Sequence, residues 1–496
     1  METNGRKIVI IGGGIAGLCA AVYAQKCGYQ AEVLEMHDMA GGLAMSWRRG
    51  GYTFETCLHW FCGSDPAGAM HALWSEVFDV DRLKFVDLPE FGRLETEDGD
   101  VLRIATDPDE LEKELIERAP KDAEAIRRMA SEIRRLRNLK MPDPTKGWAK
   151  NAATLLGELP SLLLMRSLSQ VTGGEYGQRF SDPLLRTFFT VGAFNDISAI
   201  APILSIAWMG SGEAKYVVGG AQAIIRPIEE RLVSLGGKVR FNAKVERILV
   251  EGDRAVGVEL AGGETVKADW VISAADGYAT IYEMLEGKYV NAEIEKAYRT
   301  LEMFPSYLQV SLGVARDLKD QPEFVIRQLK TPLEVDPETT LNEVGFRMFH
   351  FDPTFAPAGK TAITCFLQTR NFAYWAKMRD EHPEKYRAEK QRVAKAAIDV
   401  LEKRIPGVCA AIEVVDVATP ASIFRYTGNW KGSMEGWLPT PKTGIRPLAR
   451  TLPGLRGFYM VGQWVSPGGG LPSGPMTARP VVKAICKEDG VAFRGR

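Results

Sequence analysis

The chain has 496 residues, of which 45% are apolar and 25% are charged, with 62 Lys and Arg against 63 Asp and Glu. This composition is typical of a folded globular protein and excludes a disordered chain, a collagen-like repeat and a small disulfide-stapled scaffold. The net charge of −1 gives no electrostatic support for a nucleic-acid partner. At roughly 150 residues per domain, the length predicts about three structural units. The positions of the 49 glycines carry more information than their number.

The cysteines and the N-terminal residues indicate where in the cell the protein is expected to be located. An odd number of scattered cysteines predicts reduced thiols in an intracellular protein. We expect no secretory signal peptide before the first apolar run, and no apolar stretch reaches the ~18 residues needed to cross a bilayer. The five histidines lack metal-ligand spacing, so no metal site is predicted. The sequence therefore predicts a cytoplasmic protein that lies free or against a membrane surface and does not cross it.

The first forty residues follow the order of elements found in a dinucleotide-binding βαβ unit. Residues 7–11 (KIVII) predict a strand buried on both faces, and the glycine-rich segment 12–17 follows at once. Residues 15–27 are rich in alanine and predict a helix. Residues 31–34 predict a second strand, which Glu35 follows. This order favours a nucleotide site over a glycine-rich turn without a ligand.

Each part of this unit has a physical role in binding a dinucleotide. One glycine makes a tight turn, a second lets the pyrophosphate approach the backbone, and a third lets the helix pack closely on the strand. The first helical residues present free N–H groups at the positive end of the helix dipole, and an acid after the second strand can accept from ribose hydroxyls. The predicted binding residues are Gly12, Gly14, Ile15, Ala16, Gly17 and Glu35.

A second glycine pair follows shortly after the acid. Gly41 and Gly42 extend the predicted phosphate-binding surface, and Leu43 comes next. This pair is similar to the glycine-rich extension of the amine oxidase and phytoene desaturase superfamily, which implies FAD; an ordinary surface turn is the alternative. The family usually has Arg at the position of Leu43, and Arg48 or Arg49 is the candidate to replace that contact.

Two later segments continue the resemblance. Residues 218–274 look like the returning part of the family's FAD domain, in which a residue at the position of Val245 clamps the adenine. Residues 457–474 look like its closing motif, in which a helix start faces the flavin pyrimidine and stabilises negative charge there. Gln463 stands where the family often has an acid. The positions implied are Gly462, Gln463, Gly469, Gly470, Leu471 and Gly474.

The chain thus resembles the members of the phytoene desaturase, carotenoid isomerase and retinol saturase group. The resemblance implies an α/β fold with a Rossmann-like FAD-binding domain (GR2-type) and an interleaved α+β substrate domain. Residues 1–85, 212–285 and 415–496 would form the FAD-binding domain, with segments 86–211 and 286–414 forming the substrate domain. Residues 306–317 and 347–357 look like part of the family's substrate-domain sheet.

Residues 141–208 are the least regular part of the sequence and are rich in apolar side chains. The leucine-rich segment near 150–170 has basic residues around it, which suits either a helix packed in the substrate domain or a membrane-contacting segment. A second apolar set lines an apolar tunnel or fills a core. Its members are Phe188, Phe189, Phe194, Ile197, Ile200, Ile203, Leu204 and Trp208.

Few side chains are candidates for chemistry, because in this superfamily the flavin performs the redox step and the protein binds and orients it. His59 follows a stretch that passes beside the flavin in the family, so it is either a proton donor or a structural histidine. Cys57, two residues earlier, stands where a glycine is common. Arg425 and Tyr426 belong to a loop before the closing motif that forms either an active-site wall or an ordered connection.

The resemblance implies an FAD-dependent oxidoreductase acting on carbon–carbon bonds of an apolar isoprenoid or polyene lipid. Desaturation, saturation or cis–trans isomerisation would proceed by hydride exchange with flavin N5. No second GxGxxG unit is present for NAD(P), so the electron partner is unknown, and no cysteine in the closing motif suits a covalent tether, which implies non-covalent FAD. A flavin amine oxidase and a non-catalytic flavin- or lipid-binding protein are the alternatives.

Overall fold

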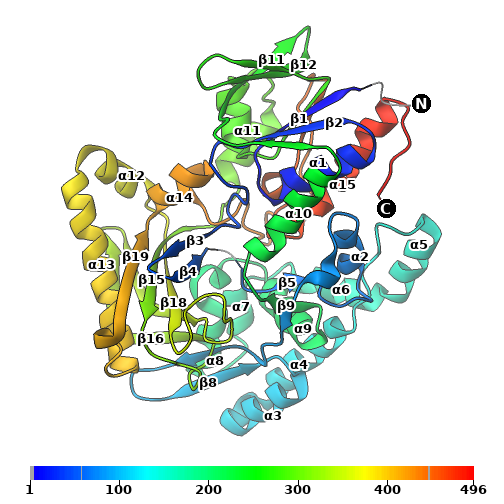
Figure 1. Cartoon of the computed structure of the whole chain (residues 1–496). Helices are drawn as coiled ribbons and strands as arrows, with labels where there is room; N and C mark the ends of the chain where they lie inside the picture. Colours follow the sequence, from blue (N-terminus) through cyan, green and yellow to red (C-terminus); the bar gives the residue numbers. More distant parts are fainter. Residues whose placement is uncertain (1–4, 57, 445–446, 496) are drawn as a thin grey trace.

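A parallel five-stranded sheet forms the upper part of the computed structural model, which describes residues 5–56, 58–444 and 447–495. Its strand order is β10-β2-β1-β14-β20, and each neighbouring pair is parallel. The strands are β1 (Lys7–Ile11), β2 (Gln30–Leu34), β10 (Lys238–Arg240), β14 (Trp270–Ser273) and β20 (Phe458–Met460). The sheet therefore joins three stretches of chain that are far apart in sequence (Figure 1).

Three helices pack with this sheet into one apolar core. The helices are α1 (Ile15–Lys26), α10 (Gln222–Ser234) and α15 (Ser473–Glu488). Contacts of α1 with both α10 and α15 bring the first and last helices of the chain together, and both termini lie on the same side of the molecule (Figure 1). Ala, Val and Leu side chains of α1 are fully buried, as expected for a helix covered on all sides.

An antiparallel meander packs on the other face of the parallel sheet. It consists of β11 (Val245–Glu251), β12 (Arg254–Leu260) and β13 (Thr265–Lys267). Val258, Val271 and Phe458 share one core between the meander and the sheet. The π-helix at Ala279–Met284 and helix α11 (Ala292–Thr300) follow β14.

A seven-stranded mixed sheet forms the second part of the molecule, in the order β19-β15-β18-β17-β16-β7-β8. Its strands are β7 (Glu90–Glu95), β8 (Val101–Ala105), β15 (Ser306–Val314), β16 (Phe324–Asp336), β17 (Thr339–Met348), β18 (Thr361–Thr369) and β19 (Ile412–Ala418). Only β7 and β16 pair in parallel among these neighbours. The expected domain boundary at residue 415 falls inside β19, so that strand belongs to this sheet as a whole.

Helices cover this sheet and bridge it to the parallel sheet. On one side lie α12 (Phe372–Glu381), α13 (Pro383–Arg404) and α14 (Pro420–Thr427). Val393, Ala397 and Leu401 of α13 share a core with the strands. Short sheets connect the two parts: β3 (Ser46–Arg49) with β4 (Tyr52–Glu55), and β9 (Ala214–Val217) between β5 (Phe61–Cys62) and β6 (Phe85–Val86).

The region between β8 and β9 is helical, including the leucine-rich segment near 150–170. Its helices are α3 (Pro108–Arg118), α4 (Ala123–Arg137), α5 (Trp148–Gly157), α6 (Leu159–Leu168), α7 (Gly173–Gly177), α8 (Pro183–Thr190) and α9 (Ile200–Ser211). Phe188, Phe189 and Ile203 are buried in one core with α3 and α4, which favours the core interpretation for these side chains. No helix in the described part of the chain is long and apolar enough to span a membrane.

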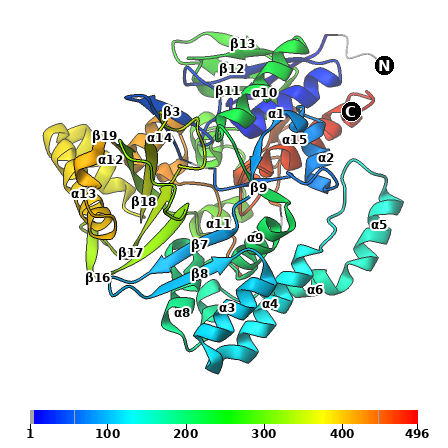
Figure 2. The same ribbon diagram turned by 60° about the horizontal axis from the view of Figure 1, so that its bottom comes forward.

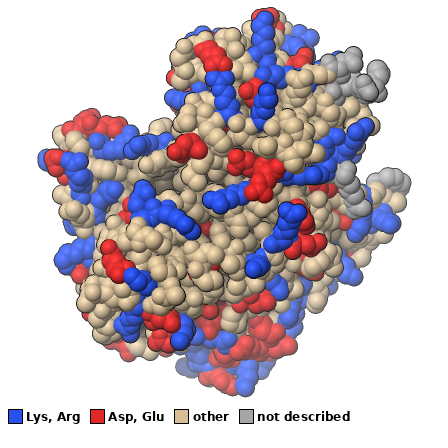
Figure 3. All heavy atoms as spheres, viewed as in Figure 1, with Lys and Arg blue, Asp and Glu red and all other residues tan. Residues whose placement is uncertain are grey.

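The surface in the view of Figure 1 carries acidic and basic side chains interspersed with one another (Figure 3). This distribution matches the balanced count of charges in the sequence. A mixed-sign surface creates no long-range attraction for a polyanion such as a nucleic acid.

Candidate cofactor and active site

A cavity of about 620 Å³ lies at the carboxyl ends of the parallel strands. Ligands of open parallel sheets bind at this edge, and the volume lies in the range of cofactor sites. Residues from both ends of the chain line it. Of the residues predicted from sequence, the lining contains Gly12, Gly14, Ile15, Ala16, Glu35, Gly41, Gly42, Leu43, Val245, Gly462, Gln463, Gly470 and Leu471, and also Arg425 and Tyr426.

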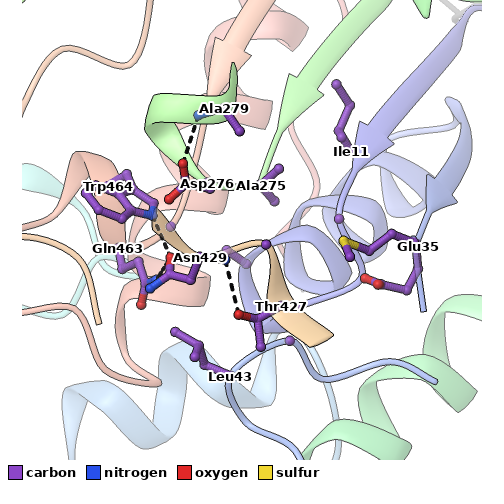
Figure 4. A pocket seen from close by; sticks show the side chains of 18 of the residues that line it. Ile11, Glu35, Leu43, Ala275, Asp276, Ala279, Thr427, Asn429, Gln463 and Trp464 are labelled. Carbon is purple, nitrogen blue, oxygen red and sulfur yellow. Dashed lines mark hydrogen bonds between the residues drawn. The ribbon is translucent and has the colours of Figure 1, made fainter. Parts of the chain in front are cut away.

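Glu35 marks one end of the cavity (Figure 4). Its carboxylate accepts backbone N–H groups from Gly13 at 2.7 Å and His37 at 2.8 Å, and the residue is 5% exposed. These two bonds hold the carboxylate at the end of β2 while leaving lone pairs for further donors. The arrangement suits the ribose hydroxyls of an adenosine.

The two glycine segments lie in direct contact with each other, and both line the cavity. Gly14 forms a β-bridge with Gly41, and a Cβ atom on Gly42 would lie 3.3 Å from the Cα of Gly14. Gly42 also has a φ of +59°, which disfavours any residue with a side chain. Helix α1 starts here with no side-chain cap, so its first N–H groups point to the cavity as an anion site.

Three of the predicted glycines pack elements together instead of lining the cavity. A Cβ on Gly17 would lie 2.0 Å from the carbonyl oxygen of Gly12, so α1 reaches β1 only because Gly17 has no side chain. A Cβ on Gly474 would meet the Ile15 side chain at 3.0 Å, at the contact of α15 with α1. Gly469 faces the Glu435 carboxylate. These positions support the cofactor site indirectly.

Asn429 organises the other end of the cavity. Its Oδ1 accepts from Gln463 Nε2 and from Trp464 Nε1, both at 3.0 Å. Its Nδ2 donates to the carbonyls of Ser433 at 2.7 Å and Glu435 at 3.2 Å. Asn429 is 3% exposed and thus ties the closing motif to the loop after α14 (Figure 4). One of the two N–H groups of the Gln463 amide is therefore bonded to Asn429.

Glu435 is a lining residue that the sequence analysis missed. Its carboxylate lies beside the Gly469–Gly470 turn just before α15 and accepts the Gly470 N–H. Burial raises the pKa of Glu435 to about 8, although the Gly470 bond partly opposes the rise. The carboxyl group is therefore mostly protonated at neutral pH. No motif surrounds it, so only the folding of the 429–435 loop over the cavity identifies it.

Asp276 also lies in the wall, after the end of β14. Its carboxylate accepts the backbone N–H groups of Ala279 and Trp430, both at 2.8 Å. Burial raises its pKa to about 7, and the backbone bonds oppose the rise. Asp276 thus joins the π-helix to the loop that Asn429 holds (Figure 4).

His59 lies outside the large cavity, and its environment argues against the alternative that it is a proton donor. Burial, together with the adjacent Arg347 guanidinium, lowers its pKa to about 3. His59 is therefore neutral at pH 7 and has no second proton to give. Cys57, which stands where the family often has glycine, lies outside the described residues.

Arg425 and Tyr426 line the nucleotide end of the cavity and not the end where α15 begins. The Tyr426 ring contacts the ring of His37 edge-on, with centroids 5.1 Å apart, and His37 is held by Glu35. The Arg425 guanidinium lies 5.1 Å from the Tyr426 ring centroid and is exposed. Both positions argue against a role in the chemical step.

Arg48 and Arg49 do not replace the arginine that the family has at position 43. Both are exposed on β3 and are absent from the cavity lining among the described residues. Arg49 lies 3.9 Å from Asp416 instead. The phosphate-binding surface is therefore built from backbone N–H groups and from the helix start.

The features of this cavity fit FAD as one set. It offers a ribose acceptor in Glu35, a backbone cradle at the contact of Gly14 with Gly42 that a Cβ on Gly42 would disturb, and the uncapped start of α1. Its two ends are chemically different: a fixed carboxylate at one, and a hydrogen-bonded amide network with a protonated carboxyl group at the other. A dinucleotide with a polar heteroaromatic ring matches this order.

Comparison with known proteins agrees with this assignment. The model of the flavin containing amine oxidoreductase family matches residues 15–486. The chloroplast prolycopene isomerase of Arabidopsis thaliana is 26% identical over 483 residues, which cover 93% of this chain and 80% of that protein. The lycopene-forming phytoene desaturase of Paracoccus sp. (strain N81106 / MBIC 01143) is 25% identical over 510 residues, 97% of each chain.

A solved oxidoreductase structure from Methanosarcina mazei shares the fold. It superposes with a TM-score of 0.59 at 18% identity, over 96% of this chain and all 100% of that one. The predicted α/β architecture, the FAD cofactor and the resemblance to this superfamily are thereby confirmed. The chain belongs to the flavin containing amine oxidoreductase family and is an FAD-dependent oxidoreductase.

Proposed function

We propose that this enzyme acts on carbon–carbon bonds of an apolar isoprenoid or polyene lipid, as a desaturase, a saturase or a cis–trans isomerase. The names of its full-length relatives, a prolycopene isomerase and a phytoene desaturase, support this substrate class. FAD supplies the acceptor or donor of a hydride. The observation that carries the proposal is a set of aromatic side chains in contact with His59, which we call the aromatic wall.

The aromatic wall consists of ring side chains that contact one another and are only partly buried. The His59 ring contacts Phe324 and Phe366, with centroids 6.3 and 6.4 Å apart, and Trp60 at 5.7 Å. Trp60 continues the contact chain to Phe91 at 5.6 Å, and Phe91 to Phe194 at 6.2 Å. A surface of this kind binds an extended hydrocarbon by area burial without fixing it through charges.

In this proposal Glu435 is the residue that holds a proton at the ring end of the cofactor cavity. Its carboxyl group is protonated at neutral pH and lies beside the start of α15. A group with a pKa near the working pH can donate and take back a proton efficiently. Asn429, through Gln463 and Trp464, keeps this end of the cavity in one arrangement.

We also propose that FAD is held non-covalently. The described residues that line the cavity include no cysteine, which is consistent with release of the cofactor on denaturation. Acid precipitation of the purified protein should leave the flavin in the supernatant. A flavin that stays with the precipitated chain would contradict this part of the proposal.

The test of the main proposal separates three reactions. The FAD-loaded protein, in its oxidised and in its chemically reduced form, is incubated anaerobically with a panel of polyenes. The masses of the products are then measured by mass spectrometry. Products two hydrogens lighter than the substrate indicate a desaturase, those two hydrogens heavier indicate a saturase, and isobaric products indicate an isomerase. If benzylamine or a polyamine reduces the flavin while no polyene reacts, the enzyme is an amine oxidase. If the flavin shows no redox response at all, it is a non-catalytic binder.

The leucine-rich segment supports contact with a membrane surface. Leu155, Leu156, Leu159 and Leu163 are 41%, 76%, 52% and 59% exposed. Leu168, by contrast, is buried in the helical core. Helices α5 and α6 project away from the body of the molecule (Figure 2). Exposed leucines with basic neighbours are typical of a segment lying in a lipid interface.

We therefore propose that α5 and α6 dock on a lipid bilayer through these four leucines. Sedimentation with liposomes of anionic phospholipid should carry down the wild-type protein. Replacing Leu156, Leu159 and Leu163 with Ser should abolish co-sedimentation without changing the melting temperature, because those side chains pack little in the folded protein. Equal co-sedimentation of both proteins would exclude this segment as the contact.

A further inference from the structure

A second and much smaller cavity adjoins the aromatic wall. Its free volume is about 10 Å³, enough for one oxygen-sized group. Glu55, Thr56, Leu58, His59, Arg347, Phe349, Thr364 and Phe366 line it. Thr56 Oγ1 donates to the carbonyl of Leu43 at 2.6 Å, and Leu43 lines the cofactor cavity. The small cavity is thus adjacent to the cofactor site.

Arg347 fixes the protonation of His59. The guanidinium lies 2.9 Å from His59 Nδ1 and donates to the carbonyls of Leu58 at 2.8 Å and His59 at 2.9 Å. An arginine can only donate, so Nδ1 is the acceptor and the ring proton is on Nε2. The positive charge behind the ring also makes this N–H a stronger donor. Among the described residues no hydrogen-bond partner occurs for Nε2.

The His59 ring borders the small cavity. Burial among protein atoms lowers its pKa, yet the ring keeps an exposed surface. His59 is also one of the residues that line the small cavity. The surrounding rings of the aromatic wall, Trp60, Phe324 and Phe366, are apolar except for the indole nitrogen.

Two buried oxygens in the same small cavity have no partner among the described residues. They are Glu55 Oε1 and Thr364 Oγ1, on residues that are 2% and 0% exposed. The other carboxylate oxygen of Glu55 accepts the Ala221 N–H at 2.9 Å. An unpaired buried polar atom costs about 1–3 kcal/mol, and a hydrocarbon in this space would leave all of these atoms unpaired.

We propose that the cavity formed by His59, Glu55 and Thr364 binds an oxygen atom of the substrate, so that the enzyme prefers an isoprenoid bearing a hydroxyl or carbonyl group over a pure hydrocarbon. His59 Nε2–H donates to that oxygen. Thr364 and Glu55 accept from a hydroxyl, or Thr364 donates to a carbonyl. The inference rests on the proposed isoprenoid substrate and adds a polar end-group to it. A bound water molecule is the other source of such an oxygen.

A competition assay tests the preference directly. FAD-loaded protein in detergent is equilibrated with tritium-labelled geranylgeraniol, a C20 isoprenoid alcohol, and the label is displaced either by the unlabelled alcohol or by the C20 hydrocarbon lacking the hydroxyl. We expect the alcohol to bind about tenfold more tightly, the ratio for one well-formed hydrogen bond. His59→Phe should reduce that ratio to about one, and His59→Gln, which keeps an amide N–H, should restore part of it.

Matched variants keep the inference testable if His59→Phe misfolds. Thr364→Val preserves shape and removes only the hydroxyl, so it should also lower the ratio. His382→Phe, on the exposed surface before α13, is the control and should leave the ratio unchanged. FAD content and melting temperature are recorded for every variant.

Each outcome has a distinct meaning. Equal affinity for alcohol and hydrocarbon in the wild-type protein overturns the inference and identifies the oxygen as water, while products from polyene hydrocarbons would leave the proposed function standing. An alcohol preference that survives both His59→Phe and Thr364→Val overturns the assignment of the cavity. Failure of both isoprenoids to bind, together with amine oxidation, overturns the inference and the proposed function.

Discussion

Replacing Glu435 with Gln should change how the stability of the cofactor-free protein depends on pH. The carboxyl group lies against the start of α15, where burial raises its pKa to about 8 from 4.5. Glutamine keeps the shape of the side chain and cannot ionise. The difference between the two proteins therefore isolates this one titration, because Asp276 and Glu55 are present in both.

The sign follows from the raised pKa. Between pH 4.5 and pH 8 the folded wild-type protein holds a proton that the unfolded chain has released, so its free energy of unfolding falls as the pH rises and levels off above pH 8. One pKa unit corresponds to about 1.4 kcal/mol, which sets a ceiling of about 5 kcal/mol. Because water reaches the cavity, we expect a fall of about 2 kcal/mol between pH 5 and pH 8.

Urea denaturation at several pH values measures this fall. The wild-type curve should drop by that amount relative to the curve of Glu435→Gln, and Glu117→Gln on the exposed face of α3 is the surface control. Parallel pH dependences in wild type and Glu435→Gln would refute the buried, protonated carboxyl group. In the FAD-loaded enzyme, the variant should also lose the limb of the pH–rate profile near pH 8 and slow the reaction by about 10²-fold or more.

Three further substitutions test the cavity. Gly42→Ala should weaken FAD binding at least about tenfold, because its Cβ would lie 3.3 Å from the Gly14 Cα at a φ of +59°. Fluorescence titration of the apoprotein with FAD measures this affinity. An unchanged affinity would show that FAD binding does not depend on the contact of Gly14 with Gly42. Gly17→Ala should instead prevent folding, since its Cβ would lie 2.0 Å from the Gly12 oxygen; a normal circular dichroism spectrum and yield would disprove the close contact. Asn429→Ala should lower the free energy of unfolding by about 3 kcal/mol in urea, because it leaves the half-buried Gln463 amide, the buried Trp464 indole and backbone partners unpaired. A change below about 1 kcal/mol would show that the loop does not depend on it.

Sequence alone was sufficient for the features that depend on neighbouring residues. A buried strand, a glycine turn, a helix and a second strand ending in Glu35 are encoded within thirty or so consecutive positions, and β1, α1 and β2 lie where this pattern places them. The glycines needed for a turn or a close approach can be recognised from their spacing in the motif, because other residues cannot replace them without steric conflict. The cofactor and the family followed from these local patterns and from the resemblance at both ends of the chain.

Only the tertiary structure decided the roles of individual side chains in the site. The low pKa of His59 depends on burial and on Arg347, which is 288 positions away in the chain. The raised pKa of Glu435 depends on the turn before α15 folding against it. Neither pKa can be read from a sequence motif, because a pKa is set by the charges and the solvent that surround a group in space, and not by its neighbours in sequence.

For the leucine-rich segment, too, the sequence did not decide which side chains are buried and which are exposed. Its composition suited both a core helix and a membrane-contacting helix, because hydrophobicity reveals that a side chain avoids water and not what covers it. The folded chain separates the two cases residue by residue: Leu168 is buried, while Leu156 is 76% exposed on a pair of projecting helices. Local sequence thus determined the elements and the nucleotide motif, and long-range packing determined which side chains became buried, charged or exposed.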